Sequence, residues 1–285
     1  MAGSSMKDIN KRVKSIKGTK QITKAMELVA ASKLQKARLQ IAHSRDYHLA
    51  IYDGMSEIIK TNTDTDSPYF NIRKIEKSCF VVLGGDRGLA GGYNSNVFRY
   101  AQDHIHSKDR VCILPIGKRA GEYFENRNYE ILSKRFSRIE EVNVGSCHEI
   151  AELITSLYLK EEFDEVFIVF THFSSLMEQQ PLIVKILPLD GSLQQEEREK
   201  DRVPLLIEPG SNAVFNAIVP SYIAGMLWGS VNESLTSEYA ARRIAMESAS
   251  KNAEEIIEDL SLKYNRARQG SITQEITEIV AGSGM

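Results

Sequence analysis

Cysteine, proline and tryptophan are scarce in this chain. Its 285 residues include only three cysteines, seven prolines and one tryptophan. Cys79, Cys112 and Cys147 are odd in number and far apart in the sequence. Their spacing fits neither a disulfide framework nor a zinc site. We therefore expect reduced, partly buried thiols, as in a cytosolic protein.

Long apolar runs are also lacking. The longest, Tyr222–Trp228 and Val166–Phe170, fall far short of the roughly 20 residues that a membrane helix needs. The first residues, MAGSSMKDIN, contain no apolar segment of the signal-peptide kind and no glycine at the second position for myristoylation. We expect a soluble chain without a transit peptide, which reaches a membrane only through a partner.

Catalytic and metal-binding patterns are missing as well. The six histidines form no H-E-x-x-H pattern. His104 and His106 fall in a predicted helix, where residues i and i+2 point apart, so they make a poor metal pair. The net charge of −2 with 26% charged residues is not typical of a nucleic-acid-binding chain. We expect no metal, no cofactor and no catalytic residue, which disfavours an enzyme.

Both ends of the chain show a narrow helical seam. Between Met6 and Lys60 there is no proline, and about 50 helical residues at ~1.5 Å each span roughly 75 Å, too long for an ordinary globular domain. The tail from Ser211 to Gly282 has the same spacing, with Pro220 near its start, where a first turn tolerates it. The seam positions in the first segment are Ile9, Val13, Ile16, Met26, Ala30, Leu34, Ala37, Ile41, Ile51, Met55 and Ile58. Those in the second are Trp228, Val231, Leu235, Ala245, Ala249, Ala253, Ile256, Leu260, Tyr264 and Ala267.

Alanine is frequent in both seams, and small residues let two helices approach closely. Neither stripe can be buried by its own helix. The simplest arrangement pairs residues 1–60 with residues 211–285 as a long antiparallel coiled coil.

The middle of the chain alternates short apolar runs with helical stretches. This alternation predicts an α/β domain over residues 75–205, with a mostly parallel sheet covered by helices. The expected strands are Ser78–Gly85, Val111–Ile116, Tyr129–Ser133, Asp164–Phe173 and Pro181–Leu189, and the expected helices are Tyr93–Ser107, Lys118–Asn126 and Cys147–Lys160. The predicted fold is therefore an α/β domain inserted into the coiled coil.

A glycine-rich turn, GGDRGLAGGYN (Gly84–Asn94), follows the first expected strand and precedes a helix. Such a turn could hold phosphate on its backbone amides. It matches neither G-x-G-x-x-G nor the P-loop, and it contains no lysine. Tight turning or partner contact is the favoured interpretation of these glycines.

The first helix is strongly basic. Residues 7–38 carry ten lysines and arginines against Asp8 and Glu27, a net charge of +8. The absence of aromatic residues from this segment argues against single-stranded nucleic acid. A solvated face or an acidic protein partner remains.

Three separated motifs together closely resemble the gamma subunit family of F-type ATP synthases. They are QITKAMELVAASKLQKAR (Gln21–Arg38), the glycine turn, and YNRARQGSITQEITEIVAGSGM (Tyr264–Met285). The last contains the family signature I-T-x-E-x-x-E-x-x-x-G, ending at Gly282. Two positions depart from the family pattern, Ser283 for alanine and Ala90 for cysteine, and both exchanges are small for small.

The resemblance implies a central rotor stalk without a catalytic site. In this family the coiled coil stands inside a ring of alternating alpha and beta subunits, and the Rossmann-like domain sits on the c-ring beside epsilon. Rotation of the c-ring by ion flow turns the stalk and drives the catalytic sites through their states. The implied location is the cytoplasmic face of the cell membrane, peripheral, with membrane contact only through the c-ring.

The resemblance also implies which residues contact partners. Lys24 and Met26 would meet acidic loops of the catalytic subunits. Glu208 and the glycine turn with Arg87 would lie in the lower body near the c-ring and epsilon. The upper contact with the catalytic ring would be made by Arg268, Gln269, Thr273 and Glu275.

Two other functions are compatible with parts of the sequence. One is an enzyme that uses the α/β domain as a nucleotide site. The other is a free-standing coiled-coil adaptor or nucleic-acid binder. Neither accounts for the three motifs together.

Overall fold

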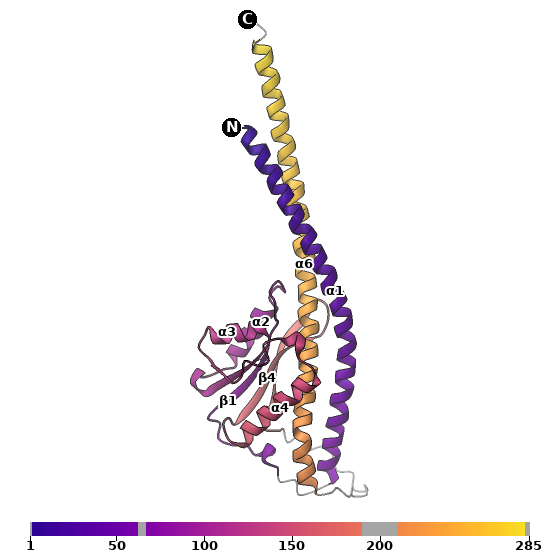
Figure 1. The fold of residues 1–285 in the computed structure, drawn as a ribbon, viewed down its shortest axis with the longest axis vertical. Coiled ribbons are helices and arrows are strands. Elements are labelled where there is room, and N and C mark those ends of the chain that lie inside the picture. Colours follow the sequence, from indigo (N-terminus) through magenta and orange to yellow (C-terminus); the bar gives the residue numbers. More distant parts are fainter. Residues whose placement is uncertain (1, 62–66, 190–209, 283–285) are drawn as a thin grey trace. The chain divides into compact units, whose positions relative to one another are not determined.

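The computed structural model describes residues 2–61, 67–189 and 210–282 and divides into two compact units. Unit 1 comprises residues 1–32 and 242–285, and unit 2 comprises residues 33–241. Two long helices contribute to both units, α1 (Ala2–Thr61) and α6 (Ser211–Gly282). The predicted fold class, an α/β domain inserted between long paired helices, is confirmed (Figure 1).

Unit 1 is an antiparallel pair formed by the first part of α1 and the last part of α6. The Thr23 and Ser250 hydroxyls lie 2.7 Å apart, and Lys20 Nζ lies 2.7 Å from Glu254 Oε1. The less exposed positions of both helices recur at alternating steps of three and four, for example 13, 16, 20, 23 and 246, 250, 253, 257. This repeat of 3.5 residues is the coiled-coil period.

The seam of α6 is shifted from its predicted positions in part of unit 1. Ser250 is buried where Ala249 was expected, and Ile256 is 47% exposed while Ile257 is half-buried. The alanines favoured a spacing nearer four residues, but the structure keeps the 3.5-residue period. A polar residue can occupy the seam at this position because Ser250 hydrogen-bonds to Thr23 across it.

Unit 2 is built on a five-stranded sheet with the order β3-β2-β1-β4-β5. The first four strands are parallel and β5 runs antiparallel to β4. The direction of β5 follows from its short connection to β4, since a parallel neighbour needs a long crossover. The strands are β1 (Ser78–Leu83), β2 (Val111–Ile116), β3 (Glu130–Ile131), β4 (Glu165–Phe173) and β5 (Gln179–Leu187).

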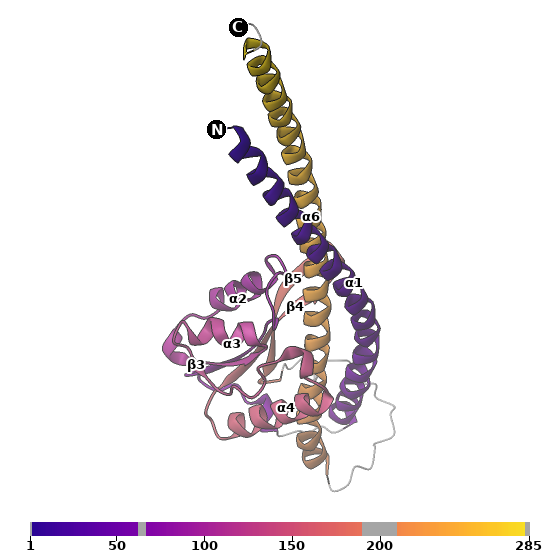
Figure 2. The same cartoon turned by 45° about the horizontal axis from the view of Figure 1, so that its top comes forward.

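Helices cover both faces of the sheet (Figure 2). On one face, α2 (Tyr93–Asp103) and α3 (Lys118–Glu125) enclose a core that includes Phe80, Phe98 and Phe124. On the other face, α4 (Val144–Leu159) and the first part of α6 pack against the alternate side chains of the same strands. The described part of the chain also contains three short 3₁₀ helices: η1 (Pro68–Phe70), η2 (Lys108–Arg110) and η3 (Ile139–Glu141).

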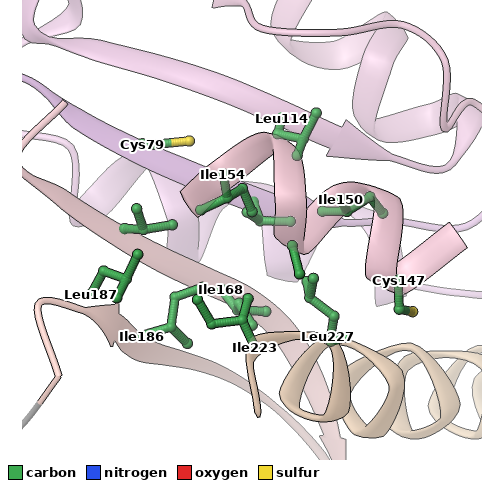
Figure 3. Packing of buried hydrophobic residues seen from close by; sticks show 14 of the residues in the cluster. Cys79, Leu114, Cys147, Ile150, Ile154, Ile168, Ile186, Leu187, Ile223 and Leu227 are labelled. Carbon is green, nitrogen blue, oxygen red and sulfur yellow. The ribbon is translucent and has the colours of Figure 1, made fainter. Parts of the chain in front are cut away.

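The core under α4 and α6 contains all three cysteines. Figure 3 shows Cys147 and Ile150 of α4 in the same layer as Leu227 of α6. Cys79 and Cys112 are direct neighbours on β1 and β2, and all three thiols are buried and free. Burial raises the pKa of Cys147 to about 12. Cys147 therefore packs as a small apolar side chain.

The start of α6 is the most apolar part of the helix. Among the described residues, α6 is the helix with a stretch apolar enough to cross a membrane by length and composition, with mean hydropathy 1.3. Core helices pass the same test, and in unit 2 the side chains of Phe215, Val219, Ile223 and Leu227 are fully buried. Pro220 lies in the helix interior, not in the first turn as predicted, because α6 begins at Ser211.

Candidate functional site

The carboxyl edge of the sheet is where parallel α/β folds hold ligands. The strand order reverses between β1 and β4, because β2 follows β1 on one side and β4 joins it on the other. In open α/β sheets the crevice at such a reversal is the usual ligand site. The glycine turn begins here, directly after β1.

Side chains of α6 occupy this crevice. The Thr171 N–H, near the end of β4, donates to Ser234 Oγ at 3.3 Å, and Ser237 Oγ donates to the Thr171 carbonyl at 3.2 Å. Both serines are fully buried, and Glu238, one residue further along α6, is 1% exposed. A Cβ placed on Gly85 would lie 2.8 Å from the Glu238 carboxyl carbon. The edge that holds a ligand in related folds holds a helix in this chain.

The glycine turn satisfies backbone amides with its own side chains. The Gly85 N–H donates to Asn94 Oδ1 at 2.8 Å. The Asp86 carboxylate accepts from the backbone N–H groups of Lys118 (3.2 Å), Ile139 (2.9 Å) and Glu140 (3.2 Å). The amides of Gly84, Gly85 and Tyr93 are thus paired with internal oxygens, and the Asp86 side chain is used to bind neighbouring loops, which supports the structural interpretation of this turn.

Close packing explains two of the glycines around the turn. A Cβ on Gly84 would lie 2.6 Å from the ring of Phe98. Gly117, which follows β2, has φ of +97°, and a Cβ there would lie 1.9 Å from the Gly84 carbonyl oxygen. Only glycine fits where these two loops approach each other.

A charged cluster lies beside the turn, on η3. The Lys33 ammonium of α1 lies 2.8 Å from Glu140 Oε1, and the Tyr239 hydroxyl of α6 donates to the same oxygen at 3.2 Å. Lys33 also lies over the Tyr239 ring, 5.2 Å from its centroid. Partial burial raises the pKa of Glu140, but hydrogen bonds from Lys33 and Tyr239 and the charges of Lys33 and Arg87 outweigh it, so the pKa is lowered. Glu140 therefore connects α1, α6 and the glycine turn.

We expect the contribution of Glu140 to stability to be lost in acid. Its folded-state pKa lies below the ordinary value of 4.5, so the ionised form stabilises the fold above that value and the effect disappears as the pH falls through the folded-state pKa. Glu140→Gln should lower the free energy of unfolding by about 0.5–1 kcal/mol near neutral pH and by little in strong acid. Urea unfolding of both proteins at the two pH values measures this. Equal losses at both would contradict it.

The basic surface of α1 is partly neutralised within unit 1. Lys24 is exposed and forms an ion pair of 2.9 Å with Glu27, and Lys20 pairs with Glu254 of α6. Met26 is half-buried beside the seam. The charge of Lys24 is therefore accompanied by an acid of its own helix, which weakens the electrostatic field around it.

The end of α6 is exposed over its last turns. Arg268, Gln269, Thr273 and Glu275 are all exposed, and the Thr273 hydroxyl donates to the Gln269 carbonyl at 3.0 Å. Four apolar side chains on the same turns are also exposed by 47–70%: Ile272, Ile276, Ile279 and Val280. Their spacing places them along one helical stripe. An exposed apolar stripe of this kind marks an interaction surface.

The predicted contact residues that the structure describes are divided between the two units. Lys24 lies near Ser250 in unit 1, and Arg268 is 18 residues further along α6, which corresponds to roughly 27 Å of helix. Arg87 is exposed on the glycine turn in unit 2, and Glu208 lies outside the described residues. Sequence reasoning missed Glu140, Glu238 and Tyr239, because their isolated positions carry no motif.

Comparisons with known proteins agree along the whole chain. The family model for ATP synthase matches residues 5–284. The "ATP synthase gamma chain" of Alkaliphilus metalliredigens is 41% identical, and the match covers 99% of this chain and 98% of the relative. The "ATP synthase gamma chain, sodium ion specific" of Acetobacterium woodii is 34% identical, and the match covers 98% of this chain and 97% of the relative.

Solved structures agree in fold. A chain of the Euglena gracilis mitochondrial ATP synthase, in a structure of OSCP, F1 and c-ring, matches with a TM-score of 0.69 at 19% identity, covering 99% of this chain and 94% of that one. A chain of the Tetrahymena thermophila mitochondrial ATP synthase central stalk and c-ring matches with a TM-score of 0.58 at 21% identity. This match covers 80% of the present chain and 99% of the Tetrahymena chain. At these identities the likeness establishes the fold.

Proposed function

We propose how this chain works from one premise: it belongs to the ATP synthase gamma chain family and is a central stalk subunit. Within the complex it transmits rotation between a membrane c-ring and the ring of alpha and beta subunits. The observation that carries this mechanism is unit 1, a two-helix rod with an exposed apolar stripe at the end of α6. A rod of two unequal helices has no rotational symmetry, so it presents a different face to each of several similar partners.

The chain contributes no catalytic site in this proposal. Three observations support it. Side chains of α6 lie at the carboxyl edge of the sheet, and internal oxygens pair the Gly84 and Gly85 amides at the start of the glycine turn. No group of three or more potential metal-ligating side chains lies close together among the described residues. ATP chemistry would therefore belong to the partner subunits.

We assign the contacts with partner subunits to the residues predicted from the sequence. Lys24 and Met26 would meet acidic loops of the catalytic subunits, and the exposed residues from Arg268 to Glu275 would meet the upper part of the ring. Arg87 and Glu208 would contact the c-ring side and epsilon. The complex would lie at the cytoplasmic face of the cell membrane, with this chain held peripherally through the c-ring. The apolar stripe supports enclosure at the upper contact, since such a surface is costly to leave in water.

Co-purification and pumping test this function. The chain should be recovered with alpha and beta subunits in a ratio of 1:3:3, and vesicles containing the complex should pump ions when ATP is added. Calorimetry of the purified chain with ATP and magnesium should detect no tight binding. Micromolar nucleotide binding by this chain alone would favour an enzyme, and salt-sensitive DNA binding without partner subunits would favour the adaptor.

Two variants should separate coupling from assembly. Met26→Lys adds a charge facing acidic loops and should strengthen, by about 0.5–1 kcal/mol, a contact that must break during rotation. A second variant, Gln269→Leu with Thr273→Leu, removes polar partners at roughly 0.5–1.5 kcal/mol per hydrogen bond. The first should lower the ions pumped per ATP and the second should slow turnover, with subunit content unchanged.

The measurement compares ATP hydrolysis with ATP-driven pumping on the same vesicles. The wild-type complex, checked for its subunit content, is the control. Normal hydrolysis and pumping in both assembled variants would show that these residues do not carry the coupling.

A further inference from the structure

Three acidic side chains on different elements meet around the glycine turn in unit 2. Asp86 lies in the turn, Glu140 on η3 and Glu238 on α6. Each contacts an element other than its own. Their position is the carboxyl edge of the sheet, where a ligand would bind in a related fold. We refer to Asp86, Glu140 and Glu238 as the acidic joint.

Asp86 ties the turn to the loops beside it. Its carboxylate accepts three backbone N–H groups, two of which belong to η3 at Ile139 and Glu140. Hydrogen bonds to a charged acceptor are stronger and shorter than neutral ones. Asp86 therefore fixes η3, and with it the Glu140 side chain, relative to β1.

Glu140 then holds both long helices. It receives Lys33 from α1 and Tyr239 from α6 on one carboxylate oxygen, at 2.8 and 3.2 Å. Lys33 and Tyr239 lie close to the ends of the unit 2 segments, which run from residue 33 to residue 241. Glu140 thus contacts α1 at the first residue of unit 2 and α6 two residues before the last one.

Glu238 of α6 packs directly against the glycine turn. Its side chain is 1% exposed and packs so closely on Gly85 that a single methyl group there would collide with the carboxyl group. Because this packing leaves the Glu238 carboxyl group no room to shift toward Gly85, Glu238 restricts the position of α6 against the turn. Ser234 and Ser237 add two hydrogen bonds from the same helix to Thr171 of β4.

We propose that the acidic joint locks α1 and α6 against rotation and sliding on the α/β body, so that load applied to the helices is borne by the sheet. This inference rests on the proposed stalk function. Apolar burial, which is extensive between α6 and the sheet, is non-directional and tolerates slippage about the helix axis. Hydrogen bonds and ion pairs are directional and define one orientation.

Two substitutions address the joint directly. Glu140→Gln removes the charge that pairs with Lys33, and Gly85→Ala places a methyl group against the Glu238 carboxyl. Gly85→Ala in a Glu238→Ala background tests whether the effect of Gly85→Ala comes from the collision with Glu238. In this background the truncated side chain at position 238 leaves room for the methyl group. The matched control is Glu122→Gln, which removes a partly exposed carboxylate whose ion-pair partners, Lys118 and Arg119, both lie in α3.

The experiment compares two rates in the reconstituted complex. ATP hydrolysis without an ion gradient reports assembly and unloaded turnover, and pumping against an imposed gradient reports performance under load. Glu140→Gln and Gly85→Ala should lose loaded pumping severalfold with unloaded hydrolysis unchanged, and Glu122→Gln should match the wild type. Gly85→Ala should have no further effect once Glu238 is alanine.

Either of two results would overturn the inference. One is loaded pumping at the wild-type rate in both joint variants, and the other is an equal loss of loaded and unloaded rates, which indicates folding or assembly. Amide exchange of the full-length chain keeps this test separate from the stalk function. Residues 234–238 should exchange about tenfold faster in Gly85→Ala than in Glu122→Gln, and unchanged exchange there would contradict the joint even if the complex does not pump.

Discussion

Replacing Gly117 with alanine is expected to lower the free energy of unfolding by more than about 4 kcal/mol, enough to prevent stable folding of many domains. The residue has φ of +97°, and an added Cβ would lie 1.9 Å from the Gly84 carbonyl oxygen and 2.9 Å from its carbon. The neighbouring backbone cannot move away easily. Gly84 N–H donates to the Ile116 carbonyl at 2.9 Å, and Gly117 N–H donates to the Phe136 carbonyl at 3.0 Å.

Gly121→Ala is the matched control, four residues further along the chain. It lies inside α3, and an added Cβ would meet nothing within 4 Å. Because alanine is the better helix former, this change should stabilise the chain by about 0.5–1 kcal/mol. Urea unfolding followed by circular dichroism measures both. Similar effects of the two substitutions would show that the backbone around Gly117 and Gly84 can move apart to accept a methyl group.

Phe215→Ala should cost about 3–5 kcal/mol, the second-largest effect we expect. The side chain is fully buried in the core between α6 and the sheet. Its ring stacks on Phe70 with centroids 5.3 Å apart and planes at 17°, a contact that adds to simple burial. Truncation leaves a cavity at the beginning of α6, where the helix is attached to the α/β body.

Leu262→Ala, in the same helix, is the comparison for this change. Leu262 is 60% exposed, so its truncation removes little burial and should change the free energy of unfolding by less than about 0.5 kcal/mol. Thermal and urea unfolding of the full-length chain provide the values. A loss below about 1 kcal/mol for Phe215→Ala would mean that the attachment of α6 does not depend on this core.

The two kinds of contact around α6 have different consequences for the proposed stalk. The apolar contacts pack α6 against the sheet and stabilise the fold through burial, as at Phe215, Val219 and Ile223. Glu238 and Tyr239 supply orientation through the acidic joint. Loss of the apolar contacts should therefore reduce stability in the free chain, whereas a loosened joint should be seen mainly under load.

Much of the fold could be predicted because its signals are local. The seams of α1 and α6, the apolar strands of the sheet and the glycine turn can each be recognised within a short window of residues. Some element ends were close as well: β1 ends at Leu83 and α4 begins at Val144, within three residues of the predicted limits. The end of α2 was predicted less well, since the helix ends at Asp103 and not at Ser107. The seam register was wrong in part because alanines lie on several faces of α6, and Ser250 lies in the seam only because Thr23 faces it.

The sequence by itself determined two long helices, an α/β body between them and the family motifs at both ends. Only the tertiary structure decided that α6 fills the crevice of the sheet and that Glu140 joins Lys33 to Tyr239. The physical reason is the distance along the chain over which each kind of interaction acts. Periodicity and turn chemistry act between neighbours in the chain, whereas the partners of Glu140 lie 107 and 99 residues away. Charge and burial at such a residue are set by which elements pack around it, and no window of sequence contains that information.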